Sequence, residues 1–368
     1  MHWGNAKQKK MQVDFFKNQL EFLKHPCPVV PYLPDALDVD IANRCNIKCA
    51  SCFHSIKKFK PFPDMTMATF NEILSQAEGR ASTITFGNHG EALLHKEVLK
   101  MIERVKDAGF FLNIITNATL LTDQVMDCLI KHRVDRLALS VDTVDPAVYP
   151  KLRKGARLKK TLGNILKFLR LNYERGLPVY VNISTVNTEM ALGSRTTVFE
   201  YFSDLPVHVI YTSDMLNFQG GLDIKNETKF IKRRYHELTS PDELPICING
   251  FDRLLIRPNG NVSLCAIDWE SIHVLGNVSE APYHVLWNNE RAQAFRRALI
   301  DKVYTPIEDT GKLCSVCDAK WVQDIARRRQ QIAALIESSH IDTKEARDVE
   351  IGKNQYLDAL LIKMKGLV

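Results

Sequence analysis

Three cysteines lie within eight residues near the start of this 368-residue sequence: Cys45, Cys49 and Cys52. Thiolates are soft ligands that suit zinc or an iron–sulfur cluster. A zinc or cubane site held entirely by protein needs four ligands, and no further cysteine occurs before Cys128. His54 could complete a zinc site, so spacing alone leaves the metal open. A metal centre held by three cysteines keeps one position free for a substrate or cofactor.

A second group of four cysteines lies in the last third of the chain: Cys247, Cys265, Cys314 and Cys317. An Asn-Gly pair at 259–260 lies between two apolar runs and predicts a hairpin, which brings Cys247 and Cys265 together. Four thiolates fit either a structural zinc site or a fully ligated cubane, and ligand chemistry alone favours zinc. We expect no export signal, and this favours metal ligation over disulfides.

Strand-like and helix-like runs alternate between these two groups. The expected strands are 37–42, 83–86, 111–116, 136–142, 179–186 and 207–211, with amphipathic helical patterns between them. This alternation predicts a parallel sheet covered by helices, and six repeats fit a partial (β/α)6 barrel better than a closed eight-fold one. Sites in such folds gather at the C-terminal ends of the strands. The first three cysteines follow the first strand, where this rule places a site.

The cysteine spacing C-x3-C-x2-C resembles the cluster loop of the radical S-adenosylmethionine (radical SAM) enzymes. The resemblance implies a [4Fe–4S] cluster on Cys45, Cys49 and Cys52, with S-adenosylmethionine on the open iron. One electron from an external donor, such as flavodoxin or ferredoxin, then releases a 5′-deoxyadenosyl radical that takes hydrogen from a substrate.

Turns after the next three strands are similar to further motifs of that family. Gly90 and Glu91 lie in a turn like the family's GGEP turn, which implies contact with the methionyl amino group; His89 and Ala92 depart from that pattern. Asn117 belongs to a Thr-Asn-Ala-x-Leu-Leu turn, where the family has glycine in place of the alanine.

The fourth strand supplies two further expected cofactor contacts. Ser140 begins a Ser-x-Asp pattern, and Arg153 follows Tyr149 with family-like spacing. By resemblance, Ser140 faces the ribose or carboxylate and Arg153 the carboxylate of S-adenosylmethionine. The forked guanidinium of arginine suits a carboxylate.

The second cysteine group resembles the SPASM or twitch extension of radical SAM enzymes. The order of Cys247, Gly260 and Cys265, followed by Gly276 and Trp287, carries this likeness. It implies one auxiliary [4Fe–4S] cluster on Cys247, Cys265, Cys314 and Cys317, suited to electron transfer. The expected fold is therefore α/β, a partial (β/α)6 TIM-like barrel followed by a small C-terminal α+β iron–sulfur domain. The expected divisions are 1–34 (helical lead), 35–215 (barrel), 216–322 (auxiliary domain) and 323–368 (helical tail).

The resemblance implies an oxidoreductase, and we expect it to oxidise a carbinol on a small sugar-like or aminocyclitol-like molecule. The alternatives are a maturase of a ribosomally made peptide or protein, and a redox-neutral sugar epimerase, for which Cys27 and Cys128 are the remaining thiols. A non-catalytic electron carrier or zinc scaffold would explain the second cysteine group but not a three-cysteine loop. Candidates to take the carbinol proton are chosen by location: His54, His89, Tyr211, Asp214 and Asp268.

Composition sets the remaining limits. Hydrophobic content of 45% and charged content of 25% are those of a globular protein. A net charge of +6, with small clusters at 57–58 and 327–329, favours a solvated surface over nucleic-acid binding. No run approaches about 18 apolar residues, so we expect no membrane span and a cytoplasmic protein.

Overall fold

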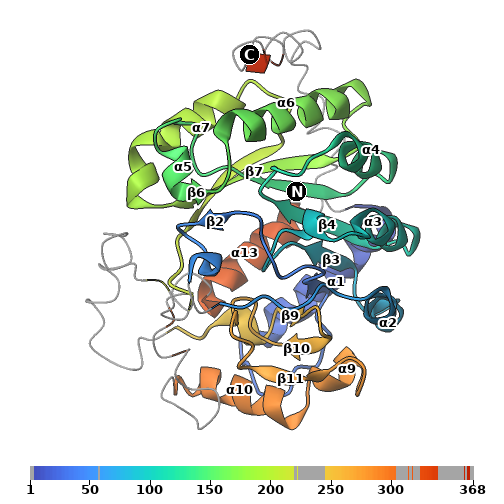
Figure 1. Ribbon diagram of the computed structural model, residues 1–368. Helices are drawn as coiled ribbons and strands as arrows, with labels where there is room; N and C mark the ends of the chain where they lie inside the picture. Colours follow the sequence, from blue (N-terminus) through green and yellow to red (C-terminus); the bar gives the residue numbers. More distant parts are fainter. Residues whose placement is uncertain are drawn as a thin grey trace.

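A computed structural model of the protein describes residues 4–56, 59–218, 222, 245–303, 314, 317, 324–338, 360 and 363–364. Six parallel strands form the core of the sheet, and each coincides with an expected strand to within a few residues (Figure 1). They are β1 (Ala36–Val39), β3 (Thr83–Phe86), β4 (Phe111–Thr116), β5 (Arg136–Ser140), β7 (Tyr180–Asn187) and β8 (Val209–Asp214). The predicted mixed α/β fold with a partial six-stranded barrel is confirmed.

The expected hairpin of the second cysteine group is also present, and it extends the barrel sheet. Strand β9 (Arg253–Ile256) pairs antiparallel with β10 (Asn261–Ser263), which pairs with β11 (Val274–Asn277). Strand β9 also pairs in parallel with β1, Leu254 opposite Leu37. The result is one nine-stranded sheet in the order β11-β10-β9-β1-β3-β4-β5-β7-β8. The hairpin between Cys247 and Cys265 is therefore paired directly with the first barrel strand.

Helices cover the outer face of the barrel strands, because each has an apolar stripe at helical spacing. In α6, residues Leu162, Ile165 and Leu169 are buried. The hydroxyl of Thr122 accepts a hydrogen bond from the Val125 N–H and so caps α4. The covering helices are α2 (Met67–Ala77), α3 (Val98–Asp107), α4 (Asp123–Lys131), α5 (Tyr149–Leu152), α6 (Leu158–Glu174) and α7 (Arg195–Phe202). Two more helices, α9 (Tyr283–Leu286) and α10 (Glu290–Ile300), follow the hairpin.

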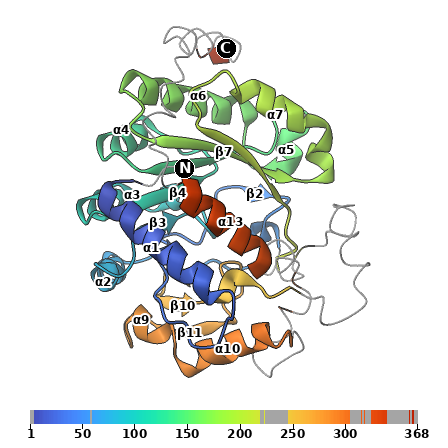
Figure 2. The same ribbon diagram turned by 180° about the vertical axis from the view of Figure 1, so that it is seen from behind.

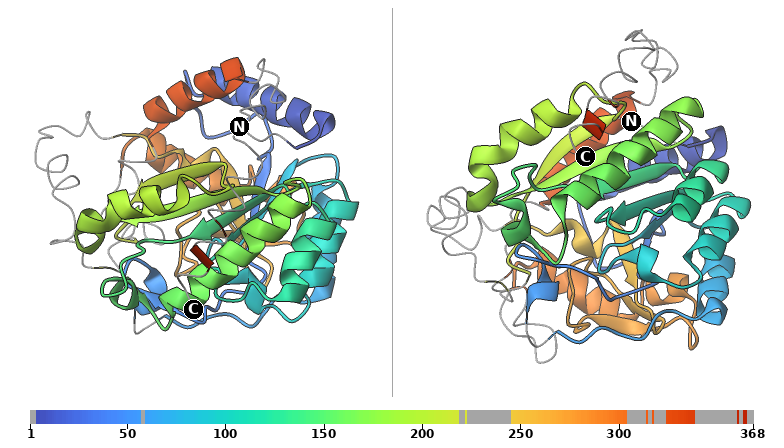
Figure 3. Two further views of the ribbon diagram at one scale, coloured as in Figure 1. Left: turned by 90° about the horizontal axis from the view of Figure 1, so that it is seen from above. Right: turned by 45° about the horizontal axis from the view of Figure 1, so that its top comes forward.

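Two helices from opposite ends of the described chain, α1 (Ala6–Phe22) and α13 (Ile325–Ser338), lie side by side behind the sheet (Figures 2 and 3). Gln19 of α1 donates to the backbone oxygen of Phe251 at 3.1 Å. Arg328 of α13 forms an ion pair with Asp252 at 2.9 Å, with the Arg328 side chain 19% exposed. The expectation that the arginine cluster at 327–329 is solvated is therefore wrong for Arg328.

Some expected features lie outside the described residues. These are the polar helix of the linker after residue 222 and most of the helical tail beyond residue 338. Among the described residues, no helix has the length and apolarity needed to cross a membrane.

Candidate active site

The first three cysteines lie on a loop that is held to the rest of the barrel by a short ribbon. Cys49 belongs to β2 (Lys48–Cys49), which pairs antiparallel with β6 (Arg153–Lys154) and places Cys49 opposite Arg153. The Ala50 N–H donates to the Leu152 carbonyl at 2.8 Å. Two backbone pairings thus fix the loop beside the segment that carries Arg153.

The three thiols are close enough to affect one another. Burial, followed by the neighbouring Cys49 and Cys45 thiols, raises the pKa of Cys52 to about 12. Metal binding replaces such protons and removes the cost of burying thiolates. Among the described residues, no three His, Cys, Asp or Glu side chains already have the spacing of metal ligands. Three neighbouring, partly buried thiols on one loop nevertheless fit a soft metal centre.

The turn after β3 packs against the start of the cysteine loop. A Cβ atom added to Gly90 would lie 2.1 Å from the Ala42 carbonyl oxygen, so only glycine fits there. The next backbone N–H, that of Glu91, donates to the Arg44 carbonyl at 2.9 Å. The turn and the loop therefore form one unit at the C-terminal ends of β1 and β3.

Glu91 joins this unit to the end of β4. Its carboxylate accepts hydrogen bonds from the Asn117 N–H at 2.8 Å, the Thr116 hydroxyl at 2.8 Å and the Leu93 N–H at 3.2 Å. Burial raises the pKa of Glu91, which is 2% exposed. The Asn117 amide in turn lies 3.6 Å from the Cys45 sulfur. Glu91 and Asn117 thus lie beside the cysteine loop. Most hydrogen-bond acceptor positions of the Glu91 carboxylate are already used by groups of the protein itself.

The remaining two expected cofactor contacts lie on the other side of the loop. Ser140 accepts a hydrogen bond from the Ser184 hydroxyl at 3.4 Å. The Arg153 Nε lies 2.9 Å from the Asp142 carboxylate, and both side chains are buried. Asp142, the acidic residue of the Ser-x-Asp pattern, is therefore the group that holds Arg153 next to Cys49.

The second cysteine group gathers around Cys265. Burial, then Asp268, and then the thiols of Cys317, Cys314 and Cys247 raise the pKa of Cys265 well above its usual range. Four thiols from three separate segments thus lie near enough to influence one another, and their number and type suit a closed four-cysteine site. The Asn249 amide lies 3.8 Å from the Cys265 sulfur and adds a hydrogen-bond donor to this group.

A cavity of about 380 Å³ is lined by neighbours of the Gly90–Glu91 turn and of the second cysteine group. Its wall includes His89, beside the Gly90–Glu91 turn, and Asn249 and Ala266, beside the second group. The other lining residues are Asn88, Leu216, Phe218, Ile248, Asp252, Arg253, Ile267, Asp324, Arg328 and Gln331. The wall combines apolar with polar side chains, and its arginines are matched by acids, since Arg253 lies 3.2 Å and Arg328 2.9 Å from Asp252.

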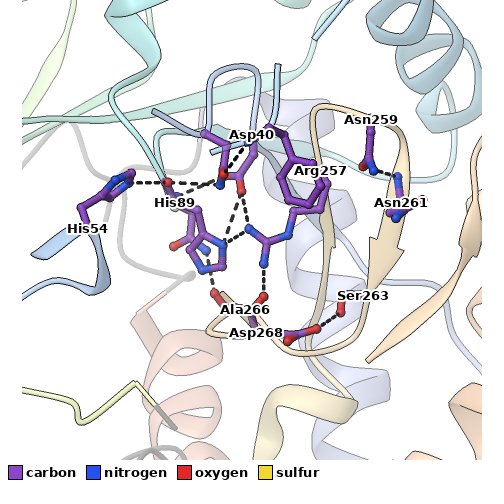
Figure 4. Close-up of polar contacts among 12 residues, drawn as sticks. Asp40, His54, His89, Arg257, Asn259, Asn261, Ser263, Ala266 and Asp268 are labelled. Atoms are coloured by element: carbon purple, nitrogen blue, oxygen red, sulfur yellow. Dashed lines mark hydrogen bonds and ion pairs between the residues drawn. The ribbon is translucent and has the colours of Figure 1, made fainter. Parts of the chain in front are cut away.

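His89 is held in a buried network that joins the barrel to the hairpin (Figure 4). Its Nδ1 lies 3.4 Å from the Asp40 carboxylate and contacts the guanidinium of Arg257, which also donates to the Asp268 carbonyl. Nδ1 thus faces both a donor, the Arg257 guanidinium, and an acceptor, the Asp40 carboxylate; in the tautomer that accepts from Arg257, the ring proton lies on Nε2. Among the described residues, Nε2 has no hydrogen-bond partner. His89, 2% exposed, thus lines the cavity and carries a buried Nε2 without a partner in the described part of the chain.

The other four candidates for proton transfer have different surroundings. His54 Nε2 lies 2.9 Å from the His89 carbonyl oxygen, and Tyr211 and Asp214 are exposed on β8. Asp268 accepts hydrogen bonds from the Ser263 hydroxyl and from the backbone N–H groups of residues 272 and 273. Of the five, His89 is the one that lines the cavity.

Two family models match the two halves of this arrangement. The model of the radical SAM superfamily matches residues 39–191, and the model of the SPASM iron–sulfur cluster-binding domain matches residues 247–318. The chain is a radical SAM protein with a SPASM domain. Its cofactors are therefore a [4Fe–4S] cluster with S-adenosylmethionine and an auxiliary iron–sulfur cluster, and both cysteine groups have the ligand chemistry for them.

Relatives of this radical SAM protein differ in what they act on. It is 26% identical over 325 residues, 77% of this chain and 88% of the relative, to the "tungsten-containing aldehyde ferredoxin oxidoreductase cofactor-modifying protein" of Pyrococcus furiosus. It is 22% identical to the AdoMet-dependent heme synthase of Methanosarcina barkeri, over 82% of this chain and 93% of the relative.

Solved structures share the fold of this radical SAM protein. SuiB of Streptococcus suis, bound to the precursor peptide SuiA, has a TM-score of 0.60 and 17% identity, covering 83% of this chain and 73% of SuiB. BtrN, in complex with AdoMet and 2-DOIA, has a TM-score of 0.51 and 19% identity, covering 77% of this chain and 93% of BtrN.

Several residues of the site are absent from the sequence-based predictions. Asp40 and Arg257 occupy inward positions at the ends of paired strands, but 217 positions separate them. Asn249 lies two positions after Cys247. This closeness in the sequence could have indicated that Asn249 belongs to the site. The pairing of β9 with β1 brings Asp40 and Arg257 together. No local sequence pattern predicts this strand pairing.

Proposed function

We propose that this radical SAM enzyme is an oxidoreductase that oxidises a carbinol on a small sugar-like or aminocyclitol-like molecule. The observation that carries the proposal is a cavity of about 380 Å³ whose wall holds His89, next to the Gly90–Glu91 turn, and Asn249 and Ala266, next to the second cysteine group. That volume falls within the range of small-molecule pockets. Paired arginines and acids together with amides offer hydrogen-bond donors and acceptors to a polyhydroxylated substrate.

When bound, the cofactors supply a 5′-deoxyadenosyl radical as hydrogen acceptor and an auxiliary cluster as electron acceptor. The protein's own residues position the substrate between them. The Nε2–H of His89 donates to the carbinol oxygen and so fixes which carbon faces the Gly90–Glu91 turn. In the oxidation, the carbinol would lose a hydrogen atom to the radical, an electron to the auxiliary cluster and its hydroxyl proton to solvent. Asn88 and Asn249 supply further amide groups on the side of the second cysteine group.

The placement of the two remaining thiols favours oxidation over epimerisation. An epimerase of this kind needs a hydrogen donor beside the substrate, and neither Cys27 nor Cys128 lines the cavity. Cys27 is exposed in the connector after α1, and Cys128 lies on α4, outside the sheet, with its thiol directed to the Leu99 carbonyl.

The proposal includes the wider setting of the enzyme. We assign the barrel to 35–215 and the auxiliary domain to 216–322, with a helical lead and tail on either side. The enzyme acts in the cytoplasm and takes its electron from a carrier such as flavodoxin or ferredoxin.

A substrate screen tests the proposal, with 5′-deoxyadenosine formation as the readout. The reconstituted enzyme receives S-adenosylmethionine, dithionite and a panel of aminocyclitols, cyclitols and sugars, and in parallel candidate precursor peptides. We expect a small polyol to stimulate 5′-deoxyadenosine formation and to give a ketone. Stimulation by a peptide alone contradicts the proposal and favours a maturase, and a sugar product of unchanged mass favours an epimerase.

A further inference from the structure

The ribbon that carries Cys49 has two lysines directly opposite each other. In the antiparallel pair of β2 and β6, Lys48 is the register partner of Lys154, as Cys49 is of Arg153 (Figure 1). Like charges at directly opposed positions destabilise a strand pair. An unfavourable lysine pair on the ribbon that carries the metal ligand Cys49 indicates that these lysines have a function.

The basic character extends around this lysine pair. Lys151, Arg157 and Lys160 are exposed, as are Lys48 and Lys154. We name these five side chains the basic ribbon. No Asp or Glu occurs in residues 41–63 or 146–173, the two segments that form it. The two segments that form the basic ribbon therefore carry exposed basic side chains and no acids of their own.

The acids on either side of these segments are already engaged. Asp64 forms an ion pair with Arg44 at 2.7 Å, and Asp142 one with Arg153 at 2.9 Å. Asp145 accepts hydrogen bonds from the backbone N–H groups of Ala147 and Val148. The basic ribbon thus presents positive potential to solvent at the segment that holds Cys49.

We propose that the basic ribbon is the docking surface for a small acidic protein that delivers one electron to the centre held by Cys45, Cys49 and Cys52. This rests on the proposed function, because a cluster that starts radical chemistry must be reduced. The carrier loses one electron and the cluster gains it, with no bond made or broken. Docking on the ribbon places the carrier beside the chain segment that contains a cluster ligand. A positive surface also speeds the encounter with an acidic partner.

The test is a double charge reversal, K48E with K154E, in the full chain with both clusters reconstituted. This variant still has two like charges opposite each other, so the electrostatic cost within the ribbon is unchanged. The matched control is K10E with K17E on α1, where both lysines are exposed and the helix lies behind the sheet (Figure 2). Reduced flavodoxin and reduced ferredoxin serve as separate probes, and stopped-flow absorbance measures cluster reduction at several salt concentrations.

For the wild type and the α1 variant we expect fast reduction that slows as salt rises. For the ribbon variant we expect reduction at least about ten-fold slower at low salt, with little dependence on salt. Equal rates and equal salt dependence in the two double variants overturn the proposal. Dithionite, a small reductant that needs no docking surface, supplies the second arm. If dithionite supports S-adenosylmethionine cleavage in neither the wild type nor the variants, the proposed function fails. If it supports cleavage in all of them, a difference in the rate of reduction by the protein carriers is due to docking.

Discussion

The carboxylate of Glu91 accepts a hydrogen bond from the backbone N–H of Asn117 at 2.8 Å, and so ties the end of β3 to the end of β4. The other oxygen of Glu91 accepts from Thr116 and Leu93. Two neighbouring motif turns are thereby held at one spacing, beside the cysteine loop.

Glu91→Gln tests this relationship. The substitution places an amide N–H₂ opposite a donor and leaves a buried donor unsatisfied, which costs about 1–3 kcal/mol. We expect the free energy of unfolding in urea to fall by that amount, and S-adenosylmethionine to bind more weakly.

The control for this change is Glu103→Gln on the exposed face of α3. It removes the same charge and should alter the free energy of unfolding by less than about 0.5 kcal/mol. Equal effects of the two substitutions would show that the hydrogen bonds of Glu91 contribute nothing beyond its charge.

His89 offers a matched pair of substitutions for the substrate site. An asparagine there keeps an acceptor near the position of Nδ1, so Arg257 stays paired, but nothing reaches the position of Nε2. A glutamine can place an amide N–H near Nε2. With the substrate that the screen identifies, we expect H89N to lower kcat/KM by roughly ten- to one-hundred-fold, the value of one hydrogen bond of about 1.5–3 kcal/mol.

H89Q should retain most of the activity that H89N loses. A steady-state comparison of the two, together with the wild type, separates a donor at the cavity from a structural role. If H89N and H89Q are equally active, the Nε2–H of His89 does not contact the substrate.

Asp35 gives the fold a pH dependence. It is 7% exposed, and burial raises its pKa from 3.8 to about 6, although Ser82 donates to its carboxylate at 2.6 Å. Between pH 4 and pH 6 the unfolded chain has released this proton while the folded protein keeps it. The free energy of unfolding therefore falls as pH rises through this range, by roughly 3 kcal/mol in all.

Asp35→Asn removes this contribution, because an amide does not titrate. The free energy of unfolding of the wild type and of D35N is measured from pH 5 to pH 7. As pH rises, the wild type should lose stability relative to D35N. A difference that stays constant over this range would mean that Asp35 titrates at its ordinary pKa in the folded protein.

Local patterns were enough to predict the strands, the hairpin and the positions of both cysteine groups. The motif turn at Asn117 illustrates why a departure from a motif can be harmless. Ala118, which stands in place of the family's glycine, adopts a φ of +62°, the left-handed conformation that glycine favours. The fold around it holds that backbone shape despite the side chain.

Contacts between distant segments were beyond prediction from the sequence. His89 and Arg257 are 168 positions apart and meet because β9 pairs with β1. Arg328 belongs to a cluster of three arginines typical of a solvated surface, yet it is paired with Asp252 behind the sheet. Both contacts depend on which strands and helices become neighbours in the fold, and residue spacing along the chain does not predict this.

Asn249 links the cavity to the second cysteine group, and it should tune the auxiliary cluster. Its amide lies 3.8 Å from the Cys265 sulfur, and a hydrogen bond to a ligating sulfur stabilises the reduced cluster. Loss of a bond of about 1 kcal/mol corresponds to roughly 40 mV for one electron. We therefore expect Asn249→Leu to make the midpoint potential of the auxiliary cluster more negative by tens of millivolts.

The measurement is a redox titration followed by electron paramagnetic resonance, in a background where Cys45, Cys49 and Cys52 are alanine so that one cluster contributes. Asn88→Leu is the control, because Asn88 lines the same cavity but donates at 2.9 Å to the Ala266 carbonyl rather than to a sulfur. Both variants lose one amide from the cavity wall, so their polarity changes alike. An equal potential shift in the two would assign the effect to cavity polarity, whereas a shift confined to N249L assigns it to the hydrogen bond on Cys265.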